Sequence, residues 1–130
     1  MRYLFDVSAL IAFGLGHHVF HDRVFRWVDL ERKSTFLTCP ITELGFIRVA
    51  SQPAGYALSV KNARDLLQQM KSNPDLPLSF LVDDQDISVL PSWVKTPAQT
   101  TDGHLAHLAA AHHAVLATLD TNIPGAFLIP

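Results

Sequence analysis

Two apolar runs, each followed directly by an aspartate, constrain the fold of this chain more than any other feature. The first is "YLF" at 3–5, followed by Asp6, and the second is "AVLATL" at 114–119, followed by Asp120. Short, nearly continuous apolar runs are typical of strands in a parallel sheet, which is covered on both faces. Because a carboxylate removed from water without a partner costs roughly several kcal/mol, an acid at the end of such a strand requires a partner.

Segments with helical spacing separate these runs. We expect strands at 2–5, 35–38, 79–82, 114–119 and 126–129, and helices at 9–13, 18–32, 40–51, 101–113 and between Ser59 and Asn73. Ser8 and Ser59 are expected to cap helices, and Leu44 is expected to face inward. Strands that alternate with helices predict an α/β fold with a central, mainly parallel sheet. The 130 residues fit a single domain, 1–130, that can bury a core.

Composition excludes several classes of protein. The formal net charge of −2 offers no global basic field, so a nucleic acid would have to be held by a local patch or by metal ions. Cys39 is the only cysteine, which rules out an internal disulfide framework and fits a reducing cytosol. Asp6 interrupts the apolar N-terminal stretch, and no run approaches the length of a membrane span. We therefore expect a cytoplasmic protein without membrane association.

Four acids from distant segments are expected to meet at one edge of the sheet. Asp6 and Asp120 directly follow strands, Glu43 lies in the first turn of a helix after the strand at 35–38, and Asp102 lies in the first turn of another helix. Carboxyl ends of parallel strands share one edge, and ligands of α/β folds collect there. Four carboxylates at that edge repel one another. A hard divalent cation such as Mg²⁺ or Mn²⁺, which prefers oxygen ligands, relieves this repulsion.

A metal site of this kind suits phosphodiester hydrolysis. The hydroxyls of Ser8, Thr101 and Thr118 are expected to support the acids, because Thr118 shares the strand face of Asp120 and the other two flank further acids. Each acid taken alone also has a structural reading, as a helix-start acid or the first residue of a turn. The joint placement of the acids carries the prediction.

Other polar features have less specific readings. His104 and His107 could pair on a metal, but Zn²⁺ needs further ligands and there is no cysteine cluster, so we expect partly exposed helix histidines. The acidic "DDQD" at 83–86 is expected to be a solvated loop or helix start rather than a second metal site. Arg48 could contact a phosphate or could be a surface arginine, and both readings remain open.

The aromatic and basic residues of the helices also have two readings. For Phe20, Phe25 and Trp27, packing in the core or in a dimer is favoured over stacking on nucleobases. Lys61 and Arg64 could face RNA, but a solvated helix face is the expected reading.

Three blocks of the chain resemble the PIN domain, and within it the VapC-type toxin ribonucleases of bacterial toxin–antitoxin pairs. The opening "YLFDVSALIAF" at 3–13 is similar to the family's first strand with its lead aspartate. "TCPITELGFIRVASQP" at 38–53 is similar to the segment of the second acid, and "TTDGHLAHLAAAHHAVLATLDTNI" at 100–123 to the block with the last two acids. The blocks appear in family order and span nearly the whole chain.

This resemblance implies a three-layer α/β/α PIN-like fold and Mg²⁺- or Mn²⁺-dependent hydrolysis of RNA by a toxin endoribonuclease. It further implies a VapB-like antitoxin partner and a homodimer. The metal-binding and catalytic acids of the family match Asp6, Glu43, Asp102 and Asp120.

Two residues depart from the family pattern. Gly103 stands where the family usually has a larger residue and is expected to loosen the start of its helix. Asn122 stands where some members carry a further acid, so we expect one firm metal and a second that arrives with the substrate.

Two other functions, a partner-binding module and a phosphatase, share features with this sequence. A catalytically weak PIN-like module that acts mainly by binding a protein partner would be marked by loss of acids, and all four acids are present. An aspartyl-phosphate phosphatase also begins with a strand that ends in aspartate. Its chemistry needs another acid two residues further on, where this chain has Ser8.

Overall fold

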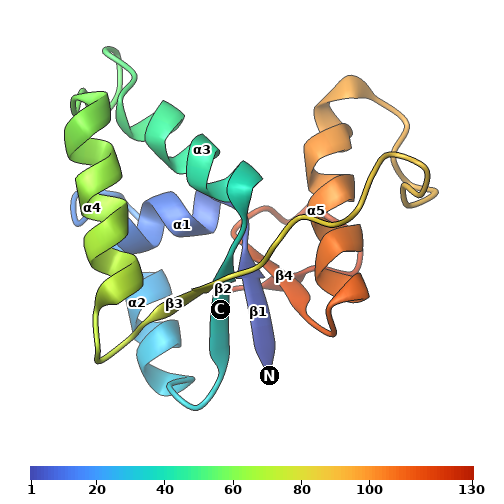
Figure 1. Cartoon of the computed structure of the whole chain (residues 1–130), viewed down its shortest axis with the longest axis horizontal. Coiled ribbons are helices and arrows are strands. Elements are labelled where there is room, and N and C mark those ends of the chain that lie inside the picture. The colour runs from blue at the N-terminus through green and yellow to red at the C-terminus, as the bar shows by residue number, and fades with distance from the viewer.

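The computed structural model describes residues 1–130 and contains a five-stranded sheet in which all neighbouring strands are parallel (Figure 1). The strands are β1 (Arg2–Phe5), β2 (Thr35–Thr38), β3 (Leu78–Phe80), β4 (Val115–Thr118) and β5 (Phe127–Leu128), in the order β3-β2-β1-β4-β5. The helices are α1 (Val7–Gly14), α2 (His21–Leu30), α3 (Pro40–Ala50), α4 (Val60–Ser72) and α5 (Thr100–Ala111), and a 3-10 turn, η1 (Pro97–Gln99), precedes α5. The predicted α/β class with a parallel sheet is confirmed.

The sheet separates two layers of helices, with α1 to α4 on one side and α5 on the other (Figure 1). Successive side chains of a strand point to opposite faces, so Tyr3 and Phe5 pack with the larger helical layer whereas Leu4 packs against α5. This burial on both faces explains why the strand sequences are nearly continuous apolar runs.

Several predicted element boundaries shift by a few residues. The helix expected at 18–32 is α2 (His21–Leu30), the strand expected at 79–82 is β3 (Leu78–Phe80), and the last strand is β5 (Phe127–Leu128). Ser59 caps α4 as predicted, because its side chain accepts a hydrogen bond from the Asn62 backbone N–H. No helix is long and apolar enough to cross a membrane.

The start of α1 differs from the prediction in a way that matters for the acids. The helix begins at Val7, and its N-cap is Asp6 rather than Ser8, because the Asp6 side chain accepts a hydrogen bond from the Ala9 backbone N–H. Asp6 therefore both ends β1 and caps α1. The expectation that Ser8 caps this helix was wrong.

Helix α3 also turns a different face inward. Leu44 was expected to be buried, but it is 67% exposed. The buried face carries Gly45 and Phe46, because α3 packs very closely against α1. A Cβ atom at position 45 would lie 2.4 Å from a Val7 methyl carbon, so only glycine permits this approach.

The chain between β3 and η1 has little regular structure but lies against α5 (Figure 1). Gly103 makes part of this contact possible, since a Cβ atom at this position would lie 2.2 Å from a Val94 methyl carbon. The sequence led us to expect that Gly103 loosens the start of its helix, but α5 is continuous from Thr100 to Ala111. The glycine admits the preceding loop into contact with the helix.

Candidate active site

Asp6 is the most enclosed acid of the molecule. Its residue is 4% exposed, at the junction between β1 and α1. One carboxylate oxygen, Oδ1, accepts hydrogen bonds from the Ala9 backbone N–H and the Ser8 hydroxyl, both at 2.8 Å. The other oxygen, Oδ2, accepts a hydrogen bond from the Thr118 hydroxyl. Ser8 and Thr118 thus support an acid as predicted, although both support Asp6.

The electrostatic balance at Asp6 is unfavourable to a lone charge. Burial raises the pKa of Asp6 above its ordinary value, the three hydrogen bonds act in the opposite direction, and the negative charge of Asp120 raises it further. The donors therefore offset only part of the cost of burying the carboxylate. A positive charge nearby would favour the ionised form.

Asp120 and Asp102 approach this carboxylate from β4 and α5. The Asp120 backbone N–H donates to the Thr118 hydroxyl at 2.9 Å, so the same threonine bonds to Asp6 and holds the turn that carries Asp120. The pKa of Asp102 is raised, first by burial and then by the charges of Asp6 and Asp120. The three aspartates predicted to meet at the sheet edge are therefore close enough to repel one another.

Glu43 is held by a different set of partners. Its Oε2 accepts a hydrogen bond from the Thr38 hydroxyl at 2.6 Å and pairs with the Lys71 ammonium at 2.8 Å. Its charge is not among the causes that raise the pKa of Asp6 or Asp102. Glu43 lies in the first turn of α3, after the carboxyl end of β2, as predicted, but its charge is matched by a lysine rather than shared with the aspartates.

Lys71 is the residue that sequence reasoning missed. It lies in the last turn of α4, and its ammonium also lies 5.0 Å from the centroid of the Phe80 ring. Nothing in the local sequence distinguishes it from the other basic residues of α4. Only the packing of α4 against α3 brings it to Glu43.

The other predicted contributors lie outside this cluster. Thr101 is exposed at the start of α5 and makes no hydrogen bond to an acid, contrary to the supporting role expected of it. Arg48 is exposed in the last turn of α3 and pairs with no acid. Thr101 is next to Asp102 in the chain but does not bond to its carboxylate, and Arg48 contacts none of the aspartates.

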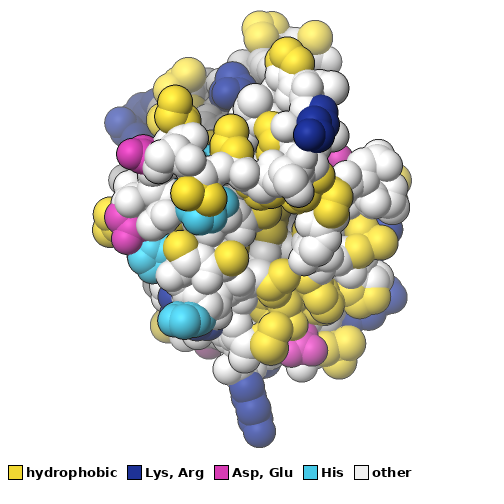
Figure 2. Space-filling model, turned by 90° about the vertical axis from the view of Figure 1, so that its right-hand side faces the viewer, with side chains coloured by type: hydrophobic (Ala, Val, Ile, Leu, Met, Phe, Trp, Pro, Cys, Tyr) yellow, Lys and Arg dark blue, Asp and Glu magenta, His cyan; other side chains and the backbone are white.

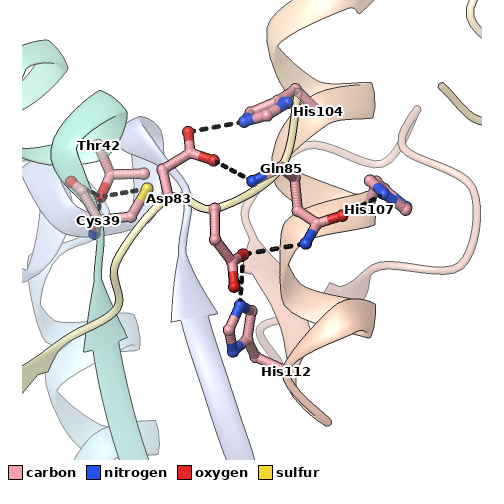
Figure 3. Close-up of polar contacts among 8 residues, drawn as sticks. Cys39, Thr42, Asp83, Gln85, His104, His107 and His112 are labelled. Carbon is pink, nitrogen blue, oxygen red and sulfur yellow. Dashed lines mark hydrogen bonds and ion pairs between the residues drawn. The ribbon is translucent and has the colours of Figure 1, made fainter. Parts of the chain in front are cut away.

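The histidines of α5 bind the preceding loop. His104 bonds to Asp83 and His112 to Asp84, both at 2.7 Å, and His107 bonds to Gln85 at 2.9 Å (Figure 3). The segment at 83–86 was expected to be a solvated loop or helix start. It instead docks on α5, because three side chains of the loop meet three histidines on one side of the helix.

These contacts affect charge as well as position. Hydrogen bonds from Gln85 and then His112 lower the pKa of Asp84. The histidines are engaged with polar side chains of the loop, and Figure 2 shows histidine and hydrophobic side chains scattered among neutral surface on this face of the molecule. The contacts give no support to a zinc site.

The aspartate cluster offers carboxylate oxygens, which are the ligands that Mg²⁺ and Mn²⁺ prefer. No group of three or more His, Cys, Asp or Glu side chains is drawn together tightly enough to form a ready coordination sphere. The donor chemistry and the mutual repulsion of the aspartates nevertheless fit a divalent cation. Neutralising the cluster would remove the repulsion that raises the pKa of Asp102.

Two hollows border the sheet edge. One, of about 510 Å³, lies between α3, α5 and the loop at 83–90, and Thr101 and His104 are in its wall. The other, of about 270 Å³, is lined by Ser8, His18, Phe20, Leu119 and Asp120. The smaller hollow shares Asp120 with the aspartate cluster.

Comparison with known proteins gives consistent relatives. Ribonuclease VapC44 of Mycobacterium tuberculosis is 36% identical over 134 residues, which cover 97% of this chain and 94% of the relative. Ribonuclease VapC38 of the same species is 31% identical over 92% of this chain and 86% of the relative. No protein-family model matches the chain.

A solved structure has the same fold at low sequence identity. It is the VapBC2 complex from Rickettsia felis bound to a DNA fragment from its promoter. The matched chain has a TM-score of 0.62 and 15% identity, and the match covers 98% of this chain and 97% of that one. The arrangement of strands and helices described above is therefore shared over practically the whole length.

Proposed function

The chain belongs to the VapC family of ribonucleases, and we propose that it cleaves RNA with a Mg²⁺ or Mn²⁺ ion held by Asp6, Asp102 and Asp120. It is a toxin endoribonuclease of a toxin–antitoxin system, and its fold is the predicted three-layer PIN-like fold. The observation that carries the proposed metal site is the buried Asp6 carboxylate, which is held by neutral donors alone and shares Thr118 with the turn that carries Asp120.

Each acid has a distinct part in this proposal. Asp6 is held by three donors in one orientation, so it provides a fixed oxygen ligand at the base of the site. Asp102 and Asp120 lie nearer the solvent and complete the carboxylate set. A divalent cation bound there would supply charge stabilisation at the scissile phosphate and activation of water.

Glu43 is proposed to act beside the cation rather than as a principal ligand. Thr38 and Lys71 both contact its Oε2, which leaves Oε1 without a hydrogen-bond partner. That free oxygen can accept a proton or orient a water molecule next to the phosphate. Arg48 stays a candidate for a phosphate contact only if the RNA extends along α3.

The proposed partners follow from the family. We infer that a VapB-like antitoxin binds and silences the protein, since the structural neighbour is part of a VapBC complex. A homodimer is also proposed from the family resemblance. A cytoplasmic location is proposed because the substrate is cellular RNA. Retention of all four acids gives no support to a catalytically weak binding module.

Cleavage of a total-RNA pool by the purified, antitoxin-free protein tests this function. We expect discrete fragments with Mg²⁺ or Mn²⁺, none with EDTA, and at least a hundredfold loss of rate in Asp6→Asn, on the scale at which removal of an electrostatic catalytic group acts. Asp29→Asn is the matched control, because Asp29 pairs with Arg32 on the surface, away from the cluster.

Calorimetric titration with Mn²⁺ supplies an independent readout. Wild type and Asp29→Asn are expected to bind Mn²⁺, and Asp6→Asn is expected to bind it much more weakly. A folded wild-type protein that neither cleaves RNA nor binds Mn²⁺ would contradict the proposed site.

A further inference from the structure

The hollow of about 270 Å³ beside Asp120 has an aromatic wall that the proposed cation site does not use. Ser8 and Asp120 belong to the sheet edge, whereas His18 and Phe20 belong to the turn that precedes α2. The hollow therefore joins the place where a phosphate would be cleaved to the exposed Phe20 ring and the half-buried His18 ring. Its volume is below the roughly 300–1,000 Å³ of sites for drug-sized ligands, so it suits one small planar group.

Phe20 is not part of the core, although packing was its expected role. Phe20 is 41% exposed, whereas Trp27 on α2 is 4% exposed. The guanidinium carbon of Arg23 lies 5.4 Å from the Phe20 ring centroid, and the Arg23 side chain is fixed by hydrogen bonds to the Ile129 carbonyl. An ordered arginine thus holds an exposed ring at the edge of the hollow.

His18 is oriented by the backbone of the same turn. Its Nδ1 accepts a hydrogen bond from the Phe20 backbone N–H at 3.0 Å, so a neutral ring carries its proton on Nε2. The His18 and Phe20 ring centroids are 5.9 Å apart at an angle of 44°. The His18 ring also stacks with Tyr56 at a centroid distance of 6.4 Å, so Phe20 and an oriented His18 line the hollow side by side.

This combination matches the chemistry of an unpaired nucleobase. Proteins bind single-stranded RNA by stacking bases on Phe, Tyr, Trp or His and by hydrogen bonds to base edges. A neutral base also avoids the repulsion that an anionic ligand would meet at Asp120. Each stacked base contributes roughly 1–3 kcal/mol, which is useful to a protein whose net charge is −2.

We propose that this hollow is a nucleobase subsite, which receives the base of an unpaired nucleotide next to the phosphate at the aspartate cluster. The inference rests on the proposed ribonuclease function and deepens it, because it assigns recognition of the substrate to His18 and Phe20. The enzyme accordingly cleaves RNA where at least one base is free to leave its stack.

Nuclear magnetic resonance titration tests the subsite without knowledge of the cellular target. The probes are the four nucleoside 5′-monophosphates, added with Mg²⁺, with inorganic phosphate as the control. We expect at least one nucleotide to shift the side-chain resonances of His18 and Phe20, and phosphate to leave them in place. If every nucleotide shifts only the resonances of the aspartates, the proposal is overturned, and the hollow would then be a contact for a protein partner.

A pair of matched variants makes the test specific. Phe20→Ala removes a ring of the hollow, whereas Phe25→Ala removes a ring of similar exposure, 45%, that does not line it. We expect Phe20→Ala to weaken nucleotide binding about fivefold or more, which corresponds to the lower end of base-stacking energies. Equal effects of the two substitutions would overturn the assignment.

Cleavage kinetics separate this inference from the proposed function. If wild type cleaves RNA, Phe20→Ala is expected to raise KM more than it lowers kcat, because a contact to the base and not to the reacting phosphate contributes uniform binding. If Phe20→Ala leaves KM and kcat unchanged in an active protein, the nucleobase subsite is contradicted and the ribonuclease function is not. If the wild-type protein binds nucleotides at His18 but cleaves no RNA, the proposed function is contradicted and the subsite is not.

Discussion

At the scale of single residues, the site contrasts two ways of stabilising a carboxylate. Asp6 relies on neutral donors, which do not fully offset its burial, and the aspartates around it add to the cost. Glu43 instead has the Lys71 ammonium within 2.8 Å. The carboxylate of Asp6 has no positive charge beside it, whereas the carboxylate of Glu43 is already paired with an ammonium group. This difference explains why we place the cation at the aspartates and not at Glu43.

Replacing Lys71 with methionine is expected to strengthen cation binding. The change leaves Glu43 uncompensated and adds one net negative charge at the carboxyl end of β2, the strand that neighbours β1. Because the Lys71 side chain is 29% exposed, the effect is modest, and we expect Mn²⁺ to bind about two- to fivefold more tightly, as calorimetry would measure. Lys61→Met is the control, since Lys61 pairs with Asp65 on an exposed face. Unchanged or weaker Mn²⁺ binding in Lys71→Met would contradict this account.

The raised pKa of Asp102 makes stability depend on pH in the cation-free protein. A carboxyl group whose pKa is higher in the folded state binds its proton more tightly there than in the unfolded chain. The free energy of unfolding contributed by this group therefore falls as the pH rises above the ordinary carboxyl value. The contribution is unfavourable at neutral pH.

Asp102→Asn is accordingly expected to stabilise the protein in EDTA. The gain at neutral pH should be a few tenths to about 1 kcal/mol, since solvent screens this incompletely buried side chain. Urea unfolding between about pH 4 and pH 7 measures it, and the two proteins should converge in stability toward the acidic end. Equal stability at neutral pH would show that neither burial nor the charges of Asp6 and Asp120 penalise the ionised Asp102 appreciably.

At the scale of elements, close contacts through glycine position the site. Gly45 allows α3 to lie against Val7 of α1, and Gly103 allows the loop before α5 to reach the helix that carries Asp102. The histidine contacts at Asp83, Asp84 and Gln85 fasten the same loop to α5 (Figure 3). The start of α5 is therefore held from the loop side by packing and by hydrogen bonds.

Gly103→Ala is expected to destabilise the protein by about 1–3 kcal/mol, the usual cost of inserting a methyl group into a packed contact. The gain in helix propensity, up to about 1 kcal/mol, offsets only part of it. Gly16→Ala is the control, because nothing lies within 4 Å of a Cβ atom there. Urea unfolding measures both, and Val94→Ala should restore stability to Gly103→Ala by removing the clashing methyl groups. Failure of that rescue would contradict the contact.

At the scale of the whole molecule, the alternation of strands and helices predicted the α/β class with a parallel sheet, and the family resemblance added the three-layer PIN-like fold. The runs before Asp6 and Asp120 are typical of strands buried on both faces, and the parallel alignment of these strands places both acids at one edge. The positions of Lys71 and of the loop at 83–86 could not be predicted this way. Each depends on which helix packs beside which, and the polar sequences involved are equally compatible with solvent exposure.

The inward face of α3 shows the same limit. Leu44 is the more hydrophobic residue, but the close approach of α1 and α3 selects the face with Gly45. Helical periodicity fixes the spacing of a buried face and does not fix which of two candidate faces meets a neighbour. The common edge of Asp6 and Asp120 was predictable because both residues follow parallel strands, whose carboxyl ends share one edge of the sheet.

The final prediction concerns how the cation couples the cluster to the stability of the entire chain. Asp6, Asp102 and Asp120 come from β1, α5 and the end of β4, so a cation that binds all three ties together segments from both ends of the sequence. A ligand that binds only the folded state adds RT ln(1 + [L]/Kd), about 2.7 kcal/mol at a hundredfold excess over Kd. For a chain of 130 residues this corresponds to a rise in Tm on the order of 10 °C.

Thermal unfolding with increasing Mn²⁺ should show this rise in wild type and in Asp29→Asn, and little of it in Asp6→Asn. The control matters because Mn²⁺ also binds weakly to surface carboxylates, which Asp29 represents. The cation joins the carboxyl ends of β1 and β4 to helix α5, which packs on the same sheet, so a single cooperative transition should shift as a whole. A rise in Tm that is equal in all three proteins would place the cation elsewhere on the surface and contradict a site built on Asp6.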